Sequence, residues 1–149
     1  MTLPSPQCTL PALSRTAMFP ARMDRLRELR RFLETFCGDS AIAGDPCLRM
    51  NLVLEELFTN TVRHGHRGDS DSPVWITLAA DGASLQLTYE DASPPFNPYG
   101  TPPGAPPDTT LRMRKVGGLG VLLTRTLAAS PEYAYLYGRN RIRLALALS

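Results

Sequence analysis

The sequence predicts an α+β fold in which helices cover one face of a mixed, mostly antiparallel sheet. Two observations carry this prediction. Apolar residues recur at about 3.6-residue spacing between residues 26 and 61, and the spacing changes to about 2 from residue 74 onward. Turn signals then join consecutive strands directly, which favours antiparallel pairing with the helices gathered on one side.

The composition fits a globular domain with a substantial core. The chain has 149 residues, of which 43% are hydrophobic and 20% are charged. Its net charge of +2 is too small to indicate a direct nucleic-acid partner. Three cysteines without metal-ligand spacing fit a reducing compartment. No apolar run suits a membrane span, and the N-terminus lacks the features of a signal peptide, so we expect a cytoplasmic protein without membrane contact.

The first part of the chain is expected to hold an arm, a strand and a helix. Residues 1–13 are expected to form a flexible arm, and residues 14–19 a short strand. Pro20 is typical of a helix start, and apolar residues at helical spacing then extend to Gly38, which is expected to end this first helix.

A second helix is expected to start at Asp45 and Pro46. This pair reads as an N-cap followed by proline at the first helical position. One apolar stripe follows, and Gly65 and Gly68 are expected to end the helix.

Two hairpins are expected after this helix. Asp81-Gly82 is the turn signal of the first hairpin, and Gly138-Arg139-Asn140 is the expected turn of the second. The four strands are expected over residues 74–79, 85–89, 133–137 and 141–148.

A proline-rich window separates the two hairpins. Seven of the 14 prolines lie between Pro94 and Pro107. Proline lacks an N–H and fixes φ, so no helix or central strand can run through this window. Beyond it come the basic residues Arg112, Arg114 and Lys115, then a glycine cluster, then a helix expected over 121–129.

The first of three clusters that could carry chemistry lies on the second helix. Glu56, Asn60 and His64 recur every four residues, so one helix stripe carries them along the border of the apolar face. A carboxylate and an amide one turn apart suit Mg²⁺, or the carboxylate could take a proton from an attacking hydroxyl. The alternative for such a stripe is a solvated helix face.

The other two clusters flank the proline window. Glu90-Asp91 ends an apolar strand, where a carboxylate could accept a hydrogen bond from an exocyclic amine or could simply begin a turn. Gly117-Gly118-Leu119-Gly120 leads into a helix, where backbone N–H groups form an anion site unless the segment is only a flexible loop. It is neither a P-loop nor the dinucleotide fingerprint, because the terminal Lys-Ser/Thr and a parallel βαβ unit are absent.

The order of the three clusters resembles the GHKL (Bergerat) ATP-binding fold, a two-layer α/β sandwich. Within it, the chain looks like the small anti-sigma-factor serine-protein kinases of bacteria. Residues 54–65 are similar to that family's N-box, residues 91–98 stand at its first glycine box, and residues 117–120 stand at its second. The resemblance implies one ATP-binding and kinase domain over 14–149, with a lid over about residues 94–116.

The resemblance also implies a role for each matching residue. Glu56 would be the catalytic base that deprotonates a serine hydroxyl, and Asn60 would be the Mg²⁺ ligand. Asp91 would accept the adenine amino group, and Phe96 would pack near the adenine. The other implied nucleotide-binding residues are His64, Gly65, Gly117, Gly118, Leu119, Gly120 and Asn140.

The function implied is that of an ATP-dependent protein serine kinase that uses Mg²⁺. Such a protein sequesters a sigma factor, phosphorylates a serine of a STAS-domain anti-sigma-factor antagonist, and is commonly a homodimer. The alternatives are a non-catalytic nucleotide-binding module that sequesters a partner, and a detached ATPase domain of the histidine-kinase type.

Three features of the sequence bear on this reading. Ser93 stands where the first glycine box usually has glycine, so nucleotide affinity is expected to be altered. No basic residue is firmly placed for the γ-phosphate, and Arg112, Arg114 and Lys115 are candidates by position. The basic residues of the first helix, between Arg22 and Arg31, could meet an acidic partner.

Overall fold

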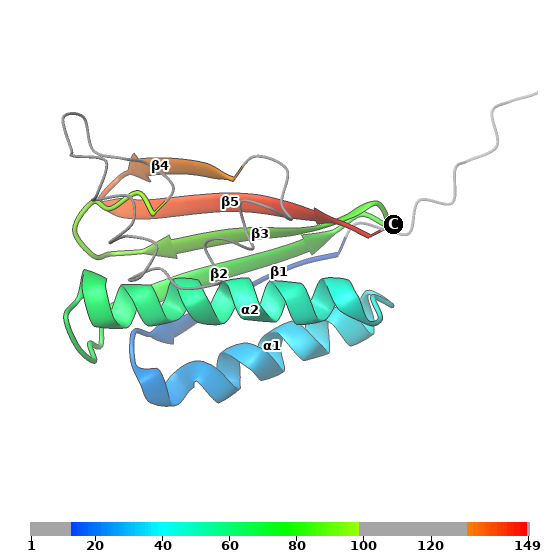
Figure 1. The fold of residues 1–149 in the computed structure, drawn as a ribbon, viewed down its shortest axis with the longest axis horizontal. Helices are drawn as coiled ribbons and strands as arrows, with labels where there is room; N and C mark the ends of the chain where they lie inside the picture. The colour runs from blue at the N-terminus through cyan, green and yellow to red at the C-terminus, as the bar shows by residue number, and fades with distance from the viewer. Residues whose placement is uncertain (1–12, 99–130, 149) are drawn as a thin grey trace, which may run out of the picture.

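The computed structural model describes residues 13–98 and 131–148, which form two layers: a five-stranded sheet and two α-helices on one of its faces (Figure 1). This confirms the predicted α+β class. In chain order the elements are β1 (Leu13–Pro20), η1 (Met23–Arg25), α1 (Leu26–Asp39), α2 (Asp45–Asn60), η2 (Thr61–Gly65), β2 (Pro73–Ala80), β3 (Ser84–Asp91), β4 (Glu132–Leu136) and β5 (Arg139–Ala147).

The strands lie in the order β1-β2-β3-β5-β4, and every ladder between the described strands is antiparallel. Alternate residues of β2, β3 and β5 point toward the helices and are buried, as the period-2 pattern predicts. On the helix side, Leu33, Phe36, Leu54 and Phe58 pack in the same apolar core. This packing holds the C-terminal end of α2 in the layer that covers the sheet.

The first helix begins later than the sequence predicts. Pro20 is the last residue of β1, where it lies opposite Pro73, and the predicted helix start at Pro20 is wrong. A proline is tolerated at a strand end because the ladder does not need its missing N–H there. The N–H of Ala21 donates to the carbonyl of Ser72 at 2.9 Å, so the pairing continues one residue further before α1 starts at Leu26.

The second helix starts where the sequence predicts, with Pro46 in its first turn. The N-cap is Gly44, with a φ of +77°, and not Asp45. At the other end, α2 runs into the π-helical turn η2, which ends at Gly65. No local sequence pattern predicts this wider turn. Such π-helical turns are frequent at functional sites.

The second hairpin turns earlier than predicted. Tyr137 and Gly138 have φ values of +54° and +77°, so these two residues form the turn. The sequence predicts Asn140 in the turn. In the structure Asn140 belongs to β5 and lies opposite Asp91 of β3. This one shift of boundary brings two of the predicted site residues face to face.

Several predicted features lie outside the described residues. These are residues 1–12 of the arm, the part of the lid beyond residue 98, the basic residues at 112–115, the glycine cluster at 117–120 and the helix over 121–129. Leu13, the last residue of the predicted arm, begins β1. Over the two described ranges, no helix combines the length and apolar character that crossing a bilayer requires.

Candidate functional site

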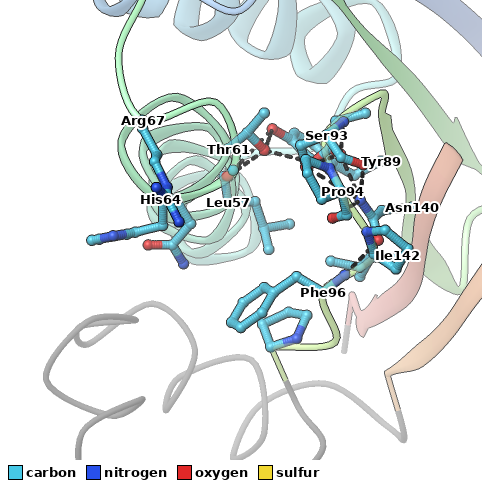
Figure 2. A pocket seen from close by; sticks show the side chains of 15 residues that line it. Leu57, Thr61, His64, Arg67, Tyr89, Ser93, Pro94, Phe96, Asn140 and Ile142 are labelled. Carbon is cyan, nitrogen blue, oxygen red and sulfur yellow. Dashed lines mark hydrogen bonds between the residues drawn. The ribbon is translucent and has the colours of Figure 1, made fainter.

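A cavity of about 360 Å³ lies where η2, the end of β3 and the start of β5 meet (Figure 2). Its wall brings together six of the nucleotide-binding residues predicted from the sequence: Asn60, His64, Gly65, Asp91, Phe96 and Asn140. Glu56 lies one helical turn before Asn60 and is not part of this wall. The described cavity is mostly apolar with a few convergent polar groups, which is the usual character of a small-molecule site.

Asp91 is a buried residue, 7% exposed, and its carboxylate accepts four hydrogen bonds. Its Oδ1 accepts from the Ser93 N–H at 3.0 Å, from the Ser93 hydroxyl at 2.7 Å and from Asn140 Nδ2 at 2.9 Å. Its Oδ2 accepts from the Thr61 hydroxyl at 2.7 Å. A carboxylate oxygen has two lone pairs, so Oδ2 keeps one acceptor position after Thr61 is bound.

Thr61 is itself oriented by Tyr89. The Tyr89 hydroxyl lies 2.7 Å from the Thr61 hydroxyl and 3.3 Å from the carbonyl of Leu57. Burial raises the pKa of Tyr89 well above its ordinary value, so the phenol keeps its proton at neutral pH. Tyr89 can therefore donate to Thr61, which donates in turn to Asp91. The sequence did not assign Thr61 or Tyr89 to the site, because both occupy positions that also suit a core.

Asn140 fastens the chain that leaves β3. Its Nδ2 lies 3.0 Å from the carbonyl of Ser93 and 3.1 Å from that of Pro94. Its Oδ1 accepts from the backbone N–H of Phe96 at 2.9 Å and from the Tyr133 hydroxyl at 2.5 Å. One side chain on β5 thus ties residues 93–96 to the sheet and fixes one wall of the cavity (Figure 2).

Ser93 fills the space that Gly65 leaves open. A Cβ added at Gly65 would lie 2.8 Å from both Cβ and Oγ of Ser93. Ser93 is 4% exposed, and its hydroxyl points to Asp91. The serine that departs from the glycine-box pattern is therefore accommodated by a glycine on η2, and its hydroxyl adds a donor to the carboxylate network.

We expect Gly65→Ala to lower the free energy of unfolding by about 1–3 kcal/mol, because the new methyl group overlaps Ser93. In the Ser93→Gly background, the same change is expected to cost little or to stabilise the helix end, since alanine is the better helix former. Urea unfolding of the two single variants and the double variant measures the coupling between the sites. Additive effects would show that the two side-chain positions do not compete for space.

Two adjacent glutamates on α2 have different surroundings. Glu55 forms an ion pair with Arg30 of α1 and lies 3.4 Å from Asn51 Nδ2. Glu56 forms no ion pair or hydrogen bond within the described residues. Burial raises the pKa of Glu56, and the nearby charge of Arg63 partly opposes this. Glu55 is therefore a link between the helices, whereas Glu56 is the carboxylate left available.

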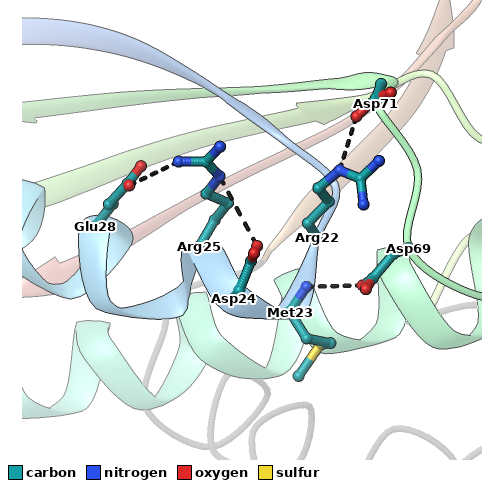
Figure 3. Close-up of polar contacts among 7 residues, drawn as sticks. All are labelled: Arg22, Met23, Asp24, Arg25, Glu28, Asp69 and Asp71. Atoms are coloured by element: carbon teal, nitrogen blue, oxygen red, sulfur yellow. Dashed lines mark hydrogen bonds and ion pairs between the residues drawn. The ribbon is translucent and has the colours of Figure 1, made fainter.

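The arginines around the start of α1 are largely paired within the molecule (Figure 3). Arg22 binds Asp71 at 2.7 Å, and Arg25 lies 2.8 Å from Glu28 and 3.8 Å from Asp24. Arg30 is bound to Glu55 as described above. In the described part of the chain, Arg27 and Arg31 are the arginines of this group without an ion pair, so the basic face expected from the sequence is partly neutralised.

Asn60 has the chemistry of a shared Mg²⁺ ligand. Its side chain is half-buried, lines the cavity and makes no hydrogen bond within the described residues. Those residues contain no group of three or more His, Cys, Asp or Glu side chains that could hold a metal by themselves. Mg²⁺ commonly takes one or two protein oxygens and completes its shell with water and substrate phosphates. The donor set thus fits a magnesium ion that arrives with a phosphorylated ligand.

The two-layer α+β sandwich, with helices on one face of a five-stranded sheet, is the architecture of the GHKL fold. Residues 19–146 match the family model described as the histidine kinase-like ATPase domain, and the chain belongs to that family. The match covers most of both described ranges and the whole segment between them. Because the family consists of ATPase domains, the match supports ATP as the ligand of this domain. No curated protein matches the chain.

The solved structures similar to the chain include the following two. The RsbU and RsbW domains of Rv1364c from Mycobacterium tuberculosis match with a TM-score of 0.57 at 16% identity, covering 91% of this chain and 33% of that one. The histidine kinase AdeS of Acinetobacter baumannii matches with a TM-score of 0.47 at 16% identity, covering 91% of this chain and 68% of that one. The first likeness shows a shared fold, and the chain spans about a third of that relative's length.

Proposed function

We propose that the cavity binds the adenine of ATP and that Asp91 accepts the adenine amino group. The observation that carries this proposal is the hydrogen bonding of the Asp91 carboxylate. Thr61, Ser93 and Asn140 hold it in one orientation, and Oδ2 retains a single acceptor position at the cavity wall. An exocyclic amine supplies the matching donor, and the apolar wall suits the faces of a purine ring.

The phosphates are proposed to extend toward the η2 side of the cavity, where Asn60 and His64 lie. Asn60 would hold Mg²⁺, which would neutralise phosphate charge when bound. His64 and Gly65 would line the phosphate path, and Phe96 would pack near the adenine. The glycine cluster Gly117, Gly118, Leu119 and Gly120 would add backbone N–H donors.

The domain is further proposed to transfer the γ-phosphoryl group to a serine. Glu56 would accept the proton of the serine hydroxyl as the oxygen attacks phosphorus and the bond to ADP breaks. Two features support this role: Glu56 is free of ion pairs within the described residues, and burial raises its pKa toward the range of a useful base. Glu55, by contrast, is held in an ion pair with Arg30.

The biological role proposed from the sequence resemblance is that of an anti-sigma-factor serine kinase. The protein would sequester a sigma factor and phosphorylate a STAS-domain antagonist, most simply as a homodimer. The order of the N-box and the two glycine boxes supports this assignment, and Glu56, unpaired among the described residues, favours it over a non-catalytic binding module.

The test is a transfer assay with the purified full chain, ATP labelled at the γ-phosphate, Mg²⁺ and a STAS-domain protein from the same organism. Labelled phosphoserine on that protein is the expected result. Nucleotide-dependent binding of the STAS-domain protein without labelling would support the non-catalytic module instead. Transfer of the label to a histidine of an added histidine-kinase dimerisation domain would favour the histidine-kinase alternative.

A further inference from the structure

Arg67 lies at the cavity and is unpaired among the residues that the structure describes. It contributes to the cavity wall, and its exposed side chain forms no ion pair or hydrogen bond within the described residues. Figure 2 shows Arg67 beside His64, on the opposite side of the cavity from Ser93 and Asn140. The positive charge therefore stands at the end of the cavity away from the Asn140 side, where the hydrogen bonds of the Asp91 network meet.

The carboxylates that follow Arg67 in the chain are engaged elsewhere. Asp69 accepts a hydrogen bond from the Met23 N–H at 2.9 Å, and Asp71 binds Arg22 (Figure 3). Among the described residues, no carboxylate therefore forms an ion pair with the Arg67 guanidinium. An unpaired guanidinium at the wall of a cavity is suited to an anionic ligand, above all to phosphate oxygens, which match its planar fork.

The backbone conformation of Arg67 is one that arginine rarely adopts. Its φ is +59°, in the left-handed region where glycine or asparagine usually ends a helix. Two backbone hydrogen bonds to η2 hold the turn on either side of Arg67. The His66 N–H donates to the carbonyl of Thr61 at 2.9 Å, and the Gly68 N–H donates to the carbonyl of Val62 at 2.7 Å. A strained, charged residue at this point is unfavourable for the turn, and such strain is commonly retained where a side chain serves a site.

We propose that Arg67 binds the phosphate chain of the nucleotide and sets the preference for ATP over ligands with fewer phosphates. This inference rests on the proposed function, because it requires the adenine at the Asp91 end of the same cavity. It names a cation for the phosphates among the described residues, a role for which the sequence placed no basic residue firmly.

The test compares Arg67→Gly with the wild-type protein by calorimetric titration of Mg-ATP, Mg-ADP and adenosine. Glycine removes the charge and suits the positive φ, so the variant is expected to fold with a Tm no lower than that of the wild type. ATP affinity is expected to fall about 10- to 100-fold, ADP affinity by less, and adenosine affinity to stay unchanged. Arg67→Lys should recover part of the loss for ATP.

Arg49→Ala is the matched control, since it removes the same charge from α2 at a side chain that pairs with Asp45 and is not in the cavity wall. It should leave all three affinities unchanged.

Equal ATP affinity in Arg67→Gly and the wild type would overturn the role of Arg67 while leaving the proposed function standing. An equal loss for adenosine and ATP would also overturn it. A wild-type protein that binds neither ATP nor adenosine would overturn the proposed function, and this inference with it.

Discussion

Replacing Asp91 with asparagine is expected to lower the affinity for ATP on the order of 100-fold, corresponding to about 3 kcal/mol. Oδ1 of Asp91 receives three donated hydrogen bonds, so the oxygen of the new amide is expected to keep that position. The amide nitrogen would then replace Oδ2 and present hydrogens to the Thr61 hydroxyl and to the adenine amino group. Two donors would face each other where the wild-type protein offers an acceptor.

A change in base preference separates this effect from simple misfolding. Inosine triphosphate carries a carbonyl oxygen in place of the adenine amino group, so Asp91→Asn is expected to bind it better than ATP, with the opposite order in the wild type. Calorimetric titrations of both proteins with both nucleotides measure the two ratios. If the substitution weakened both nucleotides by the same factor, Asp91 would be a structural residue and not the one that reads the base.

Replacing Glu56 with glutamine is expected to lower the rate of phosphoryl transfer to serine by about 10²- to 10⁴-fold, the usual contribution of a general base. ATP affinity should be unchanged, because Glu56 is not part of the cavity wall. Single-turnover transfer from γ-labelled ATP, measured beside a binding titration, separates the two quantities. A loss of binding equal to the loss of rate would contradict the assignment.

The neighbouring Glu55 supplies the control for Glu56. Glu55→Gln removes the partner of Arg30, a half-exposed pair, so its expected cost is below about 1 kcal/mol of stability with no change in transfer rate.

The pH dependence of the transfer rate gives a second readout of the role of Glu56. Burial raises the pKa of Glu56, so its proton-accepting form becomes populated at a higher pH than that of an ordinary glutamate. The transfer rate should therefore rise with pH through this pKa, and the rise should be absent in Glu56→Gln.

The sequence predicts the layers of the fold because burial repeats locally along the chain. The alternation in β2 and β3 and the helical spacing in α2 each depend on residues within one element, and the structure confirms them. The errors fall at boundaries. Pro20 suits a strand end as well as a helix start. The sequence predicts the second turn at Gly138-Arg139-Asn140, but Tyr137 has a positive φ and the turn begins there.

The carboxylate network could not be predicted in the same way. Asn140 meets Asp91 only because β3 and β5 pair in one particular register, and no short sequence pattern specifies that pairing. Thr61 reaches Asp91 because η2 packs over the end of β3. Ser93 reads as a departure from the glycine-box pattern until its contact with Gly65 is known. These contacts join residues about 30 to 50 positions apart in the chain.

The central claim is that the adenine of ATP lies in this cavity against Asp91. The most direct measurement is a crystal structure of the protein with Mg²⁺ and a non-hydrolysable ATP analogue. The account predicts the adenine amino nitrogen at about 2.7–3.2 Å from Asp91 Oδ2, with the phosphates extending toward Asn60 and Arg67. An analogue bound with its base elsewhere, or with its amino group out of hydrogen-bonding range of Asp91, would contradict it.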